Sequence, residues 1–319
     1  MTAPMPNGAA SVSMRLLATG LLAFAALVPL RAQEKPATAV PPAAAPRASL
    51  KVGVTLHPYY SWTRAIVAGS DVEVRSLLPG DVDAGNYQPR AEEIAKLAEL
   101  DAVVVNGLGH DDFLEPMIVA SGNVKLVRLT PNDATPTLRG AHGEAANSHT
   151  FISFTNAIQQ TYWLERALGE LAPQHAPLFR KNAADYARKL RRLKAAAALE
   201  LADVEAARVA TVHDGYAYLL QEFGIEVAVV IEPAHGLVPS AAELAASIDR
   251  LRSEQVRVLF SEESFPQPLL DVVRESAQAE LFVLSHVATG DYTDDKFERE
   301  MAENAATIVR ALKPAAKRQ

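Results

Sequence analysis

Two sets of four short apolar runs dominate the sequence, and segments with helical spacing lie between the runs. The first set is KVGVTL, VEVRSLL, DAVVVN and VKLVRL, within residues 51–129. The second is RVATV, VAVVI, VRVLF and LFVLS, within residues 208–285. Apolar runs separated by helices predict parallel strands that are covered by helices on both faces. The sequence therefore predicts an α/β protein with two lobes, each a four-stranded, mainly parallel sheet flanked by helices.

Between the two sets lies a segment of a different kind. Residues 176–207 contain no glycine, and their only proline, Pro177, stands at the start. Apolar residues recur there at helical spacing, which predicts one connecting helix of about seven turns. Such a helix is rigid, unlike a Gly/Ser linker. We expect an N-terminal lobe over residues 50–175, the helix over 176–207 and a C-terminal lobe over 208–319.

The first 49 residues differ in composition from the rest of the chain. Arg15 is followed by about fifteen mostly apolar residues and then by small and polar ones, a pattern typical of a secretory signal. We expect residues 1–32 to be a signal peptide and the Pro/Ala-rich residues 33–49 to be a tether. The chain has no cysteine, so thiolate metal sites and cysteine lipid anchors are excluded. These features predict a periplasmic protein that is not lipid-anchored.

The charge balance and the motifs exclude several classes of function. The formal net charge is −7, whereas a nucleic-acid-binding protein normally presents a basic face. The sequence has no G-x-S-x-G, no G-x-x-x-x-G-K-[ST] and no H-E-x-x-H motif, so the common hydrolase, nucleotide-binding and metalloprotease signatures are missing. We expect that the protein has no nucleic-acid partner and is not an enzyme.

Histidines stand at the ends of the predicted strands. His57, His213 and His286 each follow an apolar run, and His149 lies just before a helical pattern that starts near Ser153. Ligands of open α/β sheets bind beyond the carboxyl ends of the strands, which two facing lobes would gather around one cleft. Imidazole is the commonest metal ligand among side chains, and several neutral imidazoles suit zinc. The repetition predicts a metal site between the lobes.

Acidic residues follow two of the same runs. Asp214 comes after His213, and Glu262 and Glu263 follow VRVLF within VLFSEESF. We expect these carboxylates to offset the metal charge as hydrogen-bond partners of the imidazole N–H groups, unless one glutamate is itself a ligand. The other four histidines are expected outside the site: His110 beside the acids of a helix start, His142 and His235 in polar loops, and His175 at the start of the connecting helix.

From about Leu50 to the C-terminus, the chain resembles the zinc/manganese solute-binding proteins of ABC importers. The resemblance lies in SLLPGDVDAGNYQP, DAVVVNGLGHDDFL, ATVHDGYAYLLQEFGIE, VLFSEESFPQPLLDVV and YTDDKFEREMAENAATIVRAL, in that order. It implies two α/β lobes joined by a rigid helix, with one metal held between them and passed to a membrane permease. It leaves open whether a periplasmic metallochaperone loads the site. We expect a monomer.

The resemblance also implies ligands, position by position. The second histidine of the family matches His149, the third matches His213, and the last ligand, usually Asp, matches His286. The first matches Gly85 in DAGNYQP, so one ligand is missing. We expect His57 to replace it, with Asn86 as the less favoured substitute because an amide oxygen binds zinc weakly.

The expected function is that of a periplasmic, high-affinity Zn(II)-binding protein that delivers zinc to an ABC importer. Four imidazoles without an obligatory carboxylate favour Zn(II) over Mn(II), and a closed site leaves no position for a catalytic water. Three alternatives remain open. They are a manganese-binding member of the same family, a secreted zinc metallohydrolase, and a binder of an organic solute whose histidines are incidental.

Overall fold

The computed structural model describes residues 49–313, apart from residues 83, 142, 144–145 and 235 and the side chains of residues 86 and 134. Contacts divide the chain into two units, residues 1–47 and 48–319, and everything below concerns the second. The predicted signal peptide and nearly all of the predicted tether lie outside the described residues. Among the described residues, no helix has both the length and the apolar character that a membrane span requires.

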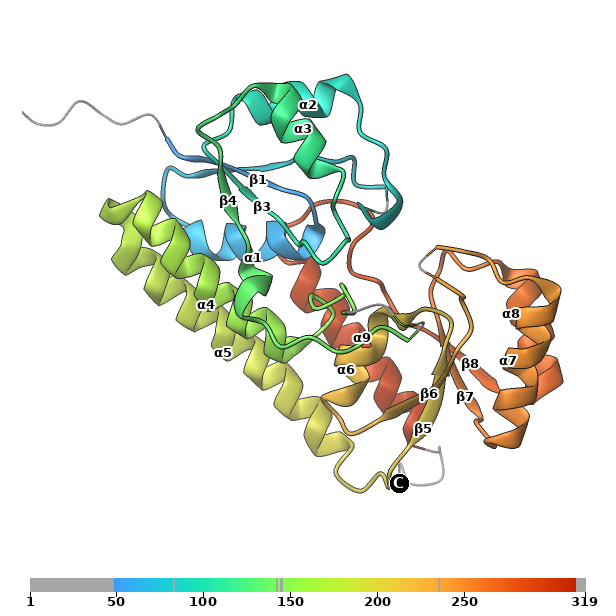
Figure 1. The fold of residues 1–319 in the computed structure, drawn as a ribbon. Coiled ribbons are helices and arrows are strands. Elements are labelled where there is room, and N and C mark those ends of the chain that lie inside the picture. Colours follow the sequence, from blue (N-terminus) through green and yellow to red (C-terminus); the bar gives the residue numbers. More distant parts are fainter. Residues whose placement is uncertain (1–48, 83, 142, 144–145, 235, 314–319) are drawn as a thin grey trace, which may run out of the picture. The chain divides into compact units, whose positions relative to one another are not determined.

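The N-terminal lobe contains a four-stranded parallel sheet in the order β2-β1-β3-β4 (Figure 1). The central strand β1 sets the register, because Val52 lies opposite both Val74 and Ala102. The helices α2 and α3 cover one face of the sheet, and α1 covers the other (Figure 1). The bounds are β1 (Lys51–Val54), α1 (His57–Val67), β2 (Glu73–Ser76), η1 (Ala84–Asn86), α2 (Ala91–Ala98), β3 (Ala102–Val104), α3 (Leu114–Ser121), β4 (Val127–Leu129) and η2 (Pro131–Ala134).

The C-terminal lobe repeats this plan with the order β6-β5-β7-β8, and again every pair is parallel. In Figure 1, α7 and α8 cover one face of the sheet, and α6 and α9 cover the other. The prediction of two four-stranded α/β sheets is therefore confirmed. The bounds are β5 (Arg208–Thr211), η4 (Asp214–Tyr216), α6 (Ala217–Gln221), β6 (Glu226–Val230), α7 (Ala241–Ser253), β7 (Val258–Ser261), α8 (Gln267–Ala277), β8 (Glu280–Val283) and α9 (Lys296–Leu312).

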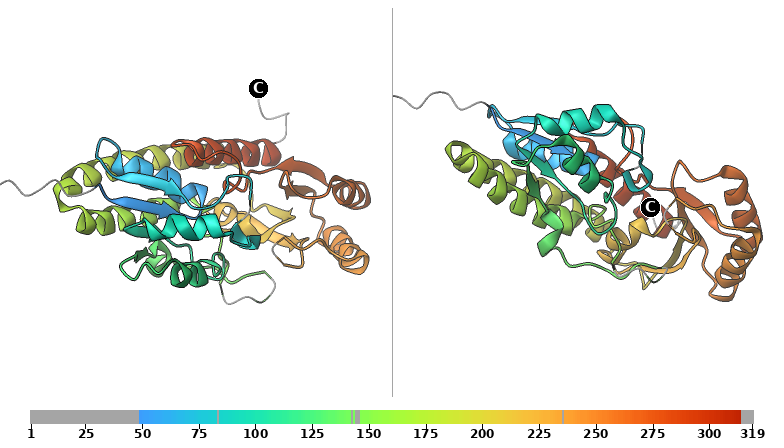
Figure 2. Two further views of the ribbon diagram at one scale, coloured as in Figure 1. Left: turned by 90° about the horizontal axis from the view of Figure 1, so that it is seen from above. Right: turned by 45° about the horizontal axis from the view of Figure 1, so that its top comes forward.

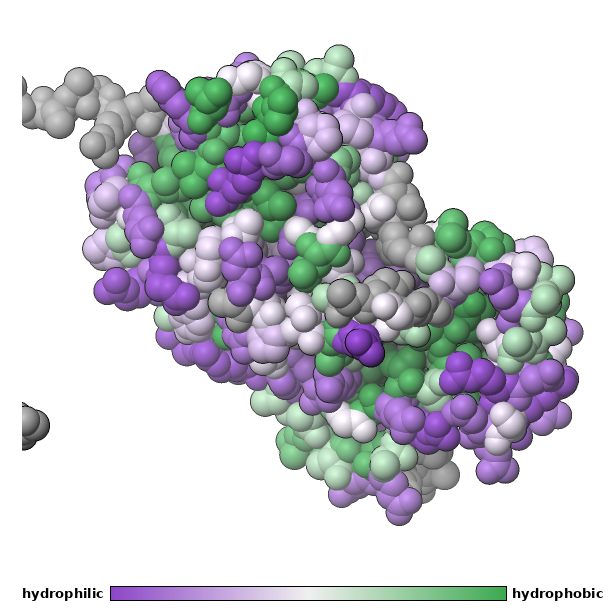
Figure 3. All heavy atoms as spheres, in the orientation of Figure 1, coloured by the Kyte–Doolittle hydropathy of each residue, from purple (hydrophilic) through white to green (hydrophobic). Residues whose placement is uncertain are grey.

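Long helices connect the two sheets. Helix α4 (Phe154–Leu171) packs along α5 (Ala176–Glu200), with the short η3 (Pro173–His175) between them (Figures 1 and 2). The connecting helix expected over residues 176–207 is thus observed as α5, which ends seven residues earlier, at Glu200. No glycine or proline marks this end. The chain turns there, at the buried Leu201, to enter β5. Hydrophilic side chains cover the part of α5 that is visible in Figure 3, as expected for a solvated face rich in Lys and Arg.

The last helix, α9, contacts both lobes. It follows β8 in the sequence, yet it packs against α1 and α5 as well as against β8. The rings of Trp62 on α1 and Phe297 on α9 meet edge to face, with centroids 5.0 Å apart, and both are fully buried. The Tyr186 hydroxyl on α5 donates a 2.8 Å hydrogen bond to Glu298 on α9. This packing places the segment between β8 and α9 against the N-terminal lobe.

Candidate metal site

Three of the four predicted ligands come together. His149 lies before α4, His213 follows β5, and His286 follows β8. One ring nitrogen from each lies within 4.8 Å of the other two. His149 and His213 are buried, and His286 is partly buried. The prediction that strand ends would gather these histidines agrees with this arrangement.

The three rings have the mutual geometry of a metal-binding group. Their centroids lie 4.5 Å apart for His149 and His213, 5.3 Å for His149 and His286, and 5.1 Å for His213 and His286. The ring planes are inclined at 86°, 69° and 62°, so the rings are not stacked. The Nε2 atoms of His149 and His213 are 3.0 Å apart. Two imidazole nitrogens on one tetrahedral zinc would be about 3.4 Å apart, given Zn–N distances of about 2.1 Å.

Glu232 orients the ring of His213. Its Oε2 lies 3.0 Å from Nδ1 of His213, and both side chains are buried. A carboxylate at Nδ1 keeps the proton on that nitrogen and leaves Nε2 free to bind a metal. We expected this role for Asp214, Glu262 or Glu263 and did not predict Glu232. The signal was present, because Glu232 follows the run VAVVI just as His213 follows RVATV.

Asn147 orients the ring of His149 in the same way. Its Oδ1 accepts the backbone N–H of His149 at 2.9 Å and lies 3.0 Å from the ring Nδ1. The other end of the amide donates a 2.9 Å hydrogen bond to the carbonyl of Asp214, in the C-terminal lobe. The Asp214 carboxylate accepts the backbone N–H of Ala141 at 2.9 Å. Asn147 and Asp214 therefore tie the His149 segment to the lobe that carries His213.

Gly215 makes room for the pair of rings. A Cβ at this position would lie 2.6 Å from Cδ2 of His213 and 3.2 Å from Cδ2 of His149. The first distance is shorter than any ordinary contact between carbon atoms. Every larger residue at position 215 would therefore displace at least one of the two histidines.

Helix α9 fixes the backbone next to His286. Asn304 accepts the backbone N–H of Ser285 at 2.7 Å and donates to its carbonyl at 2.9 Å. The Ser285 hydroxyl donates a 2.6 Å hydrogen bond to Glu300. From the other side, the Tyr216 hydroxyl donates to the carbonyl of Leu284 at 3.0 Å. These contacts hold the backbone that follows β8 and so position the main chain of His286.

The fourth expected ligand, His57, lies elsewhere among the described residues. Its Nε2 is 2.6 Å from the carbonyl oxygen of Gly290. Its ring stacks on Tyr292, with centroids 3.8 Å apart and planes inclined by 6°. Burial lowers the pKa of the imidazole to about 4, so His57 is neutral near pH 7 and its N–H donates to Gly290. It is not in the group formed by His149, His213 and His286.

The other candidates fall in different places. Glu262 accepts a 2.9 Å hydrogen bond from the Ser264 hydroxyl, and Glu263 is exposed. Among the described contacts, neither glutamate reaches one of the three histidines. Asn86 ends η1, but its side chain lies outside the described part of the chain. His142 and His235 also lie outside it.

The structure places His110 closer to the site than we expected from its sequence. Its buried ring meets His149 edge to face, with centroids 5.4 Å apart, and meets Phe151 at the same distance. Asp111 accepts two backbone N–H groups of the preceding loop at 2.7 Å each. Three consecutive residues of this loop, 107–109, have positive φ. From the sequence we interpreted His110 as a residue beside the capping acids of a helix start, and that interpretation missed the burial of the imidazole.

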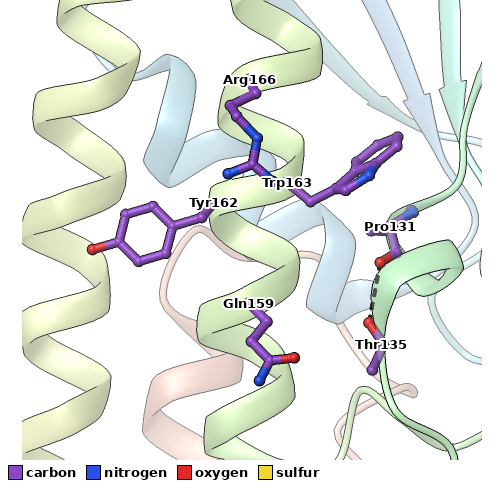
Figure 4. Close-up of a pocket in the computed structure, with 6 residues that line it drawn as sticks. All are labelled: Pro131, Thr135, Gln159, Tyr162, Trp163 and Arg166. Atoms are coloured by element: carbon purple, nitrogen blue, oxygen red, sulfur yellow. Dashed lines mark hydrogen bonds between the residues drawn. The ribbon is translucent and has the colours of Figure 1, made fainter.

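A separate hollow lies between α4 and η2. It has a volume of about 340 Å³, and its lining includes two aromatic side chains and one arginine side chain (Figure 4). Its residues are Pro131, Thr135, Gln159, Tyr162, Trp163 and Arg166. No histidine or carboxylate is among them, so the hollow offers a metal neither an imidazole nor a carboxylate ligand.

Residues 52–311 match the family described as zinc-uptake complex component A periplasmic, or ZnuA. The chain belongs to the ZnuA family. The solute-binding protein FpvC of Pseudomonas aeruginosa is 43% identical in sequence to this chain. Its structure with Ni²⁺ covers 83% of this chain and 97% of its own, with a TM-score of 0.78. A structure of FpvC with Mn²⁺ gives a TM-score of 0.79 at the same identity and share of this chain, and covers 98% of its own.

Curated ZnuA-type relatives are named for different metals. The manganese-binding lipoprotein MntA of Bacillus subtilis is 26% identical over 77% of this chain and 85% of its own length. The zinc-binding lipoprotein AdcA of Streptococcus pneumoniae is 24% identical over 83% of this chain, which spans only 55% of AdcA. Membership of the ZnuA family makes this chain a metal-binding solute-binding protein of the ABC importer type. The predicted family is therefore confirmed, and its members serve importer permeases.

Proposed function

We propose that this ZnuA-family protein captures Zn(II) in the periplasm and delivers it to the permease of an ABC importer. The observation that carries the proposal is the group of three imidazole nitrogens within 4.8 Å of one another. His149 comes from one lobe, and His213 and His286 come from the other. An ion bound there would contact both lobes, as expected for a cargo that a two-lobed binding protein encloses and releases.

The donor set favours zinc over manganese. Imidazole suits zinc, nickel and copper, whereas manganese prefers carboxylate, carbonyl and water ligands. The group contains no carboxylate among its three members, and Glu232 meets His213 at the nitrogen that faces away from His149. One buried glutamate then offsets part of the ion's charge without taking a coordination position. The names of the relatives make manganese the second candidate, because both MntA and one FpvC structure carry it.

A competition titration of the full chain tests this proposal. Metal-free protein is titrated with Zn²⁺, Mn²⁺ and Ni²⁺ in the presence of a chromophoric chelator. We expect one zinc per chain, with affinity for Zn²⁺ at least about 100-fold higher than for Mn²⁺, because imidazole donors disfavour manganese. Comparable affinities would place oxygen ligands in the site, and the absence of any metal binding would refute the proposal.

The same titration identifies the fourth ligand. Single alanine variants of His57, His110, His142 and His235 are compared with His175→Ala, the control. His175 is a sound control because its ring pairs with Asp71, at 2.6 Å, away from the group. A fourth imidazole ligand would reveal itself by a loss of affinity as large as that of His213→Ala. If none of the four shows such a loss, water or a non-histidine ligand completes the site.

A further inference from the structure

A crossing segment, residues 287–295, leaves β8 and runs along the N-terminal lobe. The backbone N–H of Gly290 donates to the carbonyl of Gly80 at 2.7 Å. Ser61 on α1 donates to the carbonyl of Thr293 at 3.0 Å. Arg64, also on α1, forms a bidentate ion pair with Asp294 at 2.9 and 3.0 Å. One lobe thus holds a segment that belongs, by sequence, to the other.

The buried side chain of His57 also contacts this segment. Its Nε2 lies 2.6 Å from the carbonyl oxygen of Gly290, and its ring covers Tyr292 face to face. The Tyr292 hydroxyl reaches back to the carbonyl of Thr55, at 3.4 Å. Both polar backbone groups of Gly290 are therefore bound by the N-terminal lobe, one by His57 and the other by Gly80. A Cβ on Gly80 would approach the Gly290 oxygen to 2.2 Å, so the backbones of the two segments lie too close together to admit a side chain at position 80.

His286 stands just before this segment, between two anchors. On one side, Ser285 is held by Asn304 and Glu300 of α9. On the other side, Gly290 is held by His57 of α1. Between the anchors, Val287 has a φ of +63°. A β-branched residue occupies this region only where its surroundings impose it, at a cost of about 1–3 kcal/mol.

From these contacts we propose that His57 is a positioning residue for the metal site. It fixes the crossing segment at Gly290 and thereby holds the backbone of His286 where its ring meets His149 and His213. It also joins α1 of the N-terminal lobe to the segment that carries a ligand of the C-terminal lobe. The inference rests on the proposed metal site, and it assigns His57 a role other than the ligand role that the sequence led us to expect.

Three substitutions separate positioning from ligation. His57→Gln keeps an N–H donor near the position of Nε2, His57→Phe keeps the ring stacked on Tyr292 but loses the donor, and His57→Ala loses both. For each variant of the full chain we measure zinc affinity and the visible spectrum of the Co²⁺-loaded protein, which reports the number and kind of ligands. We expect the glutamine variant to stay within about 3-fold of the wild type, and the phenylalanine variant to lose about 10-fold, the scale of a lost orienting contact. The Co²⁺ spectrum should be unchanged in both.

A ligand would behave differently. If His57 binds the metal, the glutamine variant loses as much affinity as the alanine variant and its Co²⁺ spectrum changes. In a His286→Ala background, His57→Phe should cause no further loss, because its effect acts through His286. A full additional loss in the double variant would overturn the proposal.

A second measurement needs no metal. Hydrogen exchange of the backbone amides of residues 287–292 in the metal-free protein should be about 10-fold faster in His57→Phe than in the wild type, because an anchor of the segment is gone. Unchanged exchange would refute the positioning role even if zinc binding proved correct. Faster exchange in a protein that binds no zinc would instead refute the proposed function and retain the anchor. Arg64→Ala is the matched control, because it removes only the exposed ion pair with Asp294, which lies beyond the measured amides, and it should leave their exchange close to that of the wild type.

Discussion

His149 and His213 bring their Nε2 atoms to 3.0 Å of each other although 64 residues separate them in the sequence. The Nδ1 atom of His213 faces Glu232 and that of His149 faces Asn147, so the two Nε2 atoms face each other. A cation bound between them would be shared by both rings. The pair is therefore poised for a metal, and substitutions around it give the sharpest tests.

The three histidines of the group should be far more sensitive to substitution than any other histidine outside it. We expect His149→Ala, His213→Ala and His286→Ala each to lower zinc affinity by more than about 100-fold, because each removes a direct ligand. A chelator-competition titration measures the loss, with His175→Ala expected to match the wild type. Zinc at 100 times the Kd should also stabilise the folded wild type by about 2.7 kcal/mol. The unfolding temperature should rise accordingly. A histidine variant that still shows this shift at the same zinc concentration would not have lost a ligand.

Glu232 should matter although it does not bind the metal. Glu232→Gln keeps the size of the side chain but removes the charge that favours a proton on Nδ1 of His213. We expect zinc affinity to fall by about 10- to 100-fold, as for other orienting carboxylates. Glu262→Gln and Glu263→Gln change the same charge outside the group, and both should bind zinc as the wild type does. Equal losses in all three variants would indicate a general effect of net charge instead.

Gly215→Ala tests the packing of the two rings without removing a ligand. The backbone of Gly215 is not in the left-handed region, so alanine adds a methyl group without backbone strain. That methyl group would lie 2.6 Å from the His213 ring and 3.2 Å from the His149 ring. We expect a loss of zinc affinity of at least about 10-fold, comparable to the loss of an orienting contact.

Gly169→Ala on α4 is the matched control for this substitution. There the nearest atom to the new methyl group would be the Cβ of Ala176, at 3.3 Å, and no ring of the site is involved. Zinc affinity should be unchanged. Wild-type affinity in Gly215→Ala would mean that the rings can rotate away and still bind the metal.

The sequence was sufficient to predict the sheets and the three gathered histidines, for a definite physical reason. A strand of a parallel sheet must be apolar on both faces, so its end is visible as the end of an apolar run, and a histidine placed there must lie at the binding edge. His213 and His286 are of this kind. The run VAVVI predicted its strand equally well, and the same rule applied to the next polar residues would have found Glu232.

What the sequence could not predict is set by contacts between distant segments. His57 also follows an apolar run, yet its ring turns toward the crossing segment, because Gly290 and Tyr292 offer it a carbonyl and a stacking surface. No local pattern distinguishes that choice from ligation. The end of α5 at Glu200 is similar, since the turn there is imposed by the path into β5 and not by a helix-breaking residue.

His57 should also make the stability of the metal-free protein depend on pH. Burial lowers its pKa from 6.5 to about 4 in the fold, whereas an unfolded chain would keep the ordinary value. Between these two values the unfolded state binds more protons, so the stability that neutral His57 contributes is present above about pH 6.5 and is lost as the pH falls toward 4. The shift corresponds to at most about 3 kcal/mol.

Glutamine at this position keeps the hydrogen bond but cannot titrate. We therefore expect the free energy of unfolding of His57→Gln, measured by urea titration with a chelator present, to fall less between pH 6.5 and pH 4 than that of the wild type. Parallel curves for His57→Gln and the wild type would mean that His57 takes up its proton in the folded protein as easily as in the unfolded chain, and that its ring is not held in a buried, neutral form.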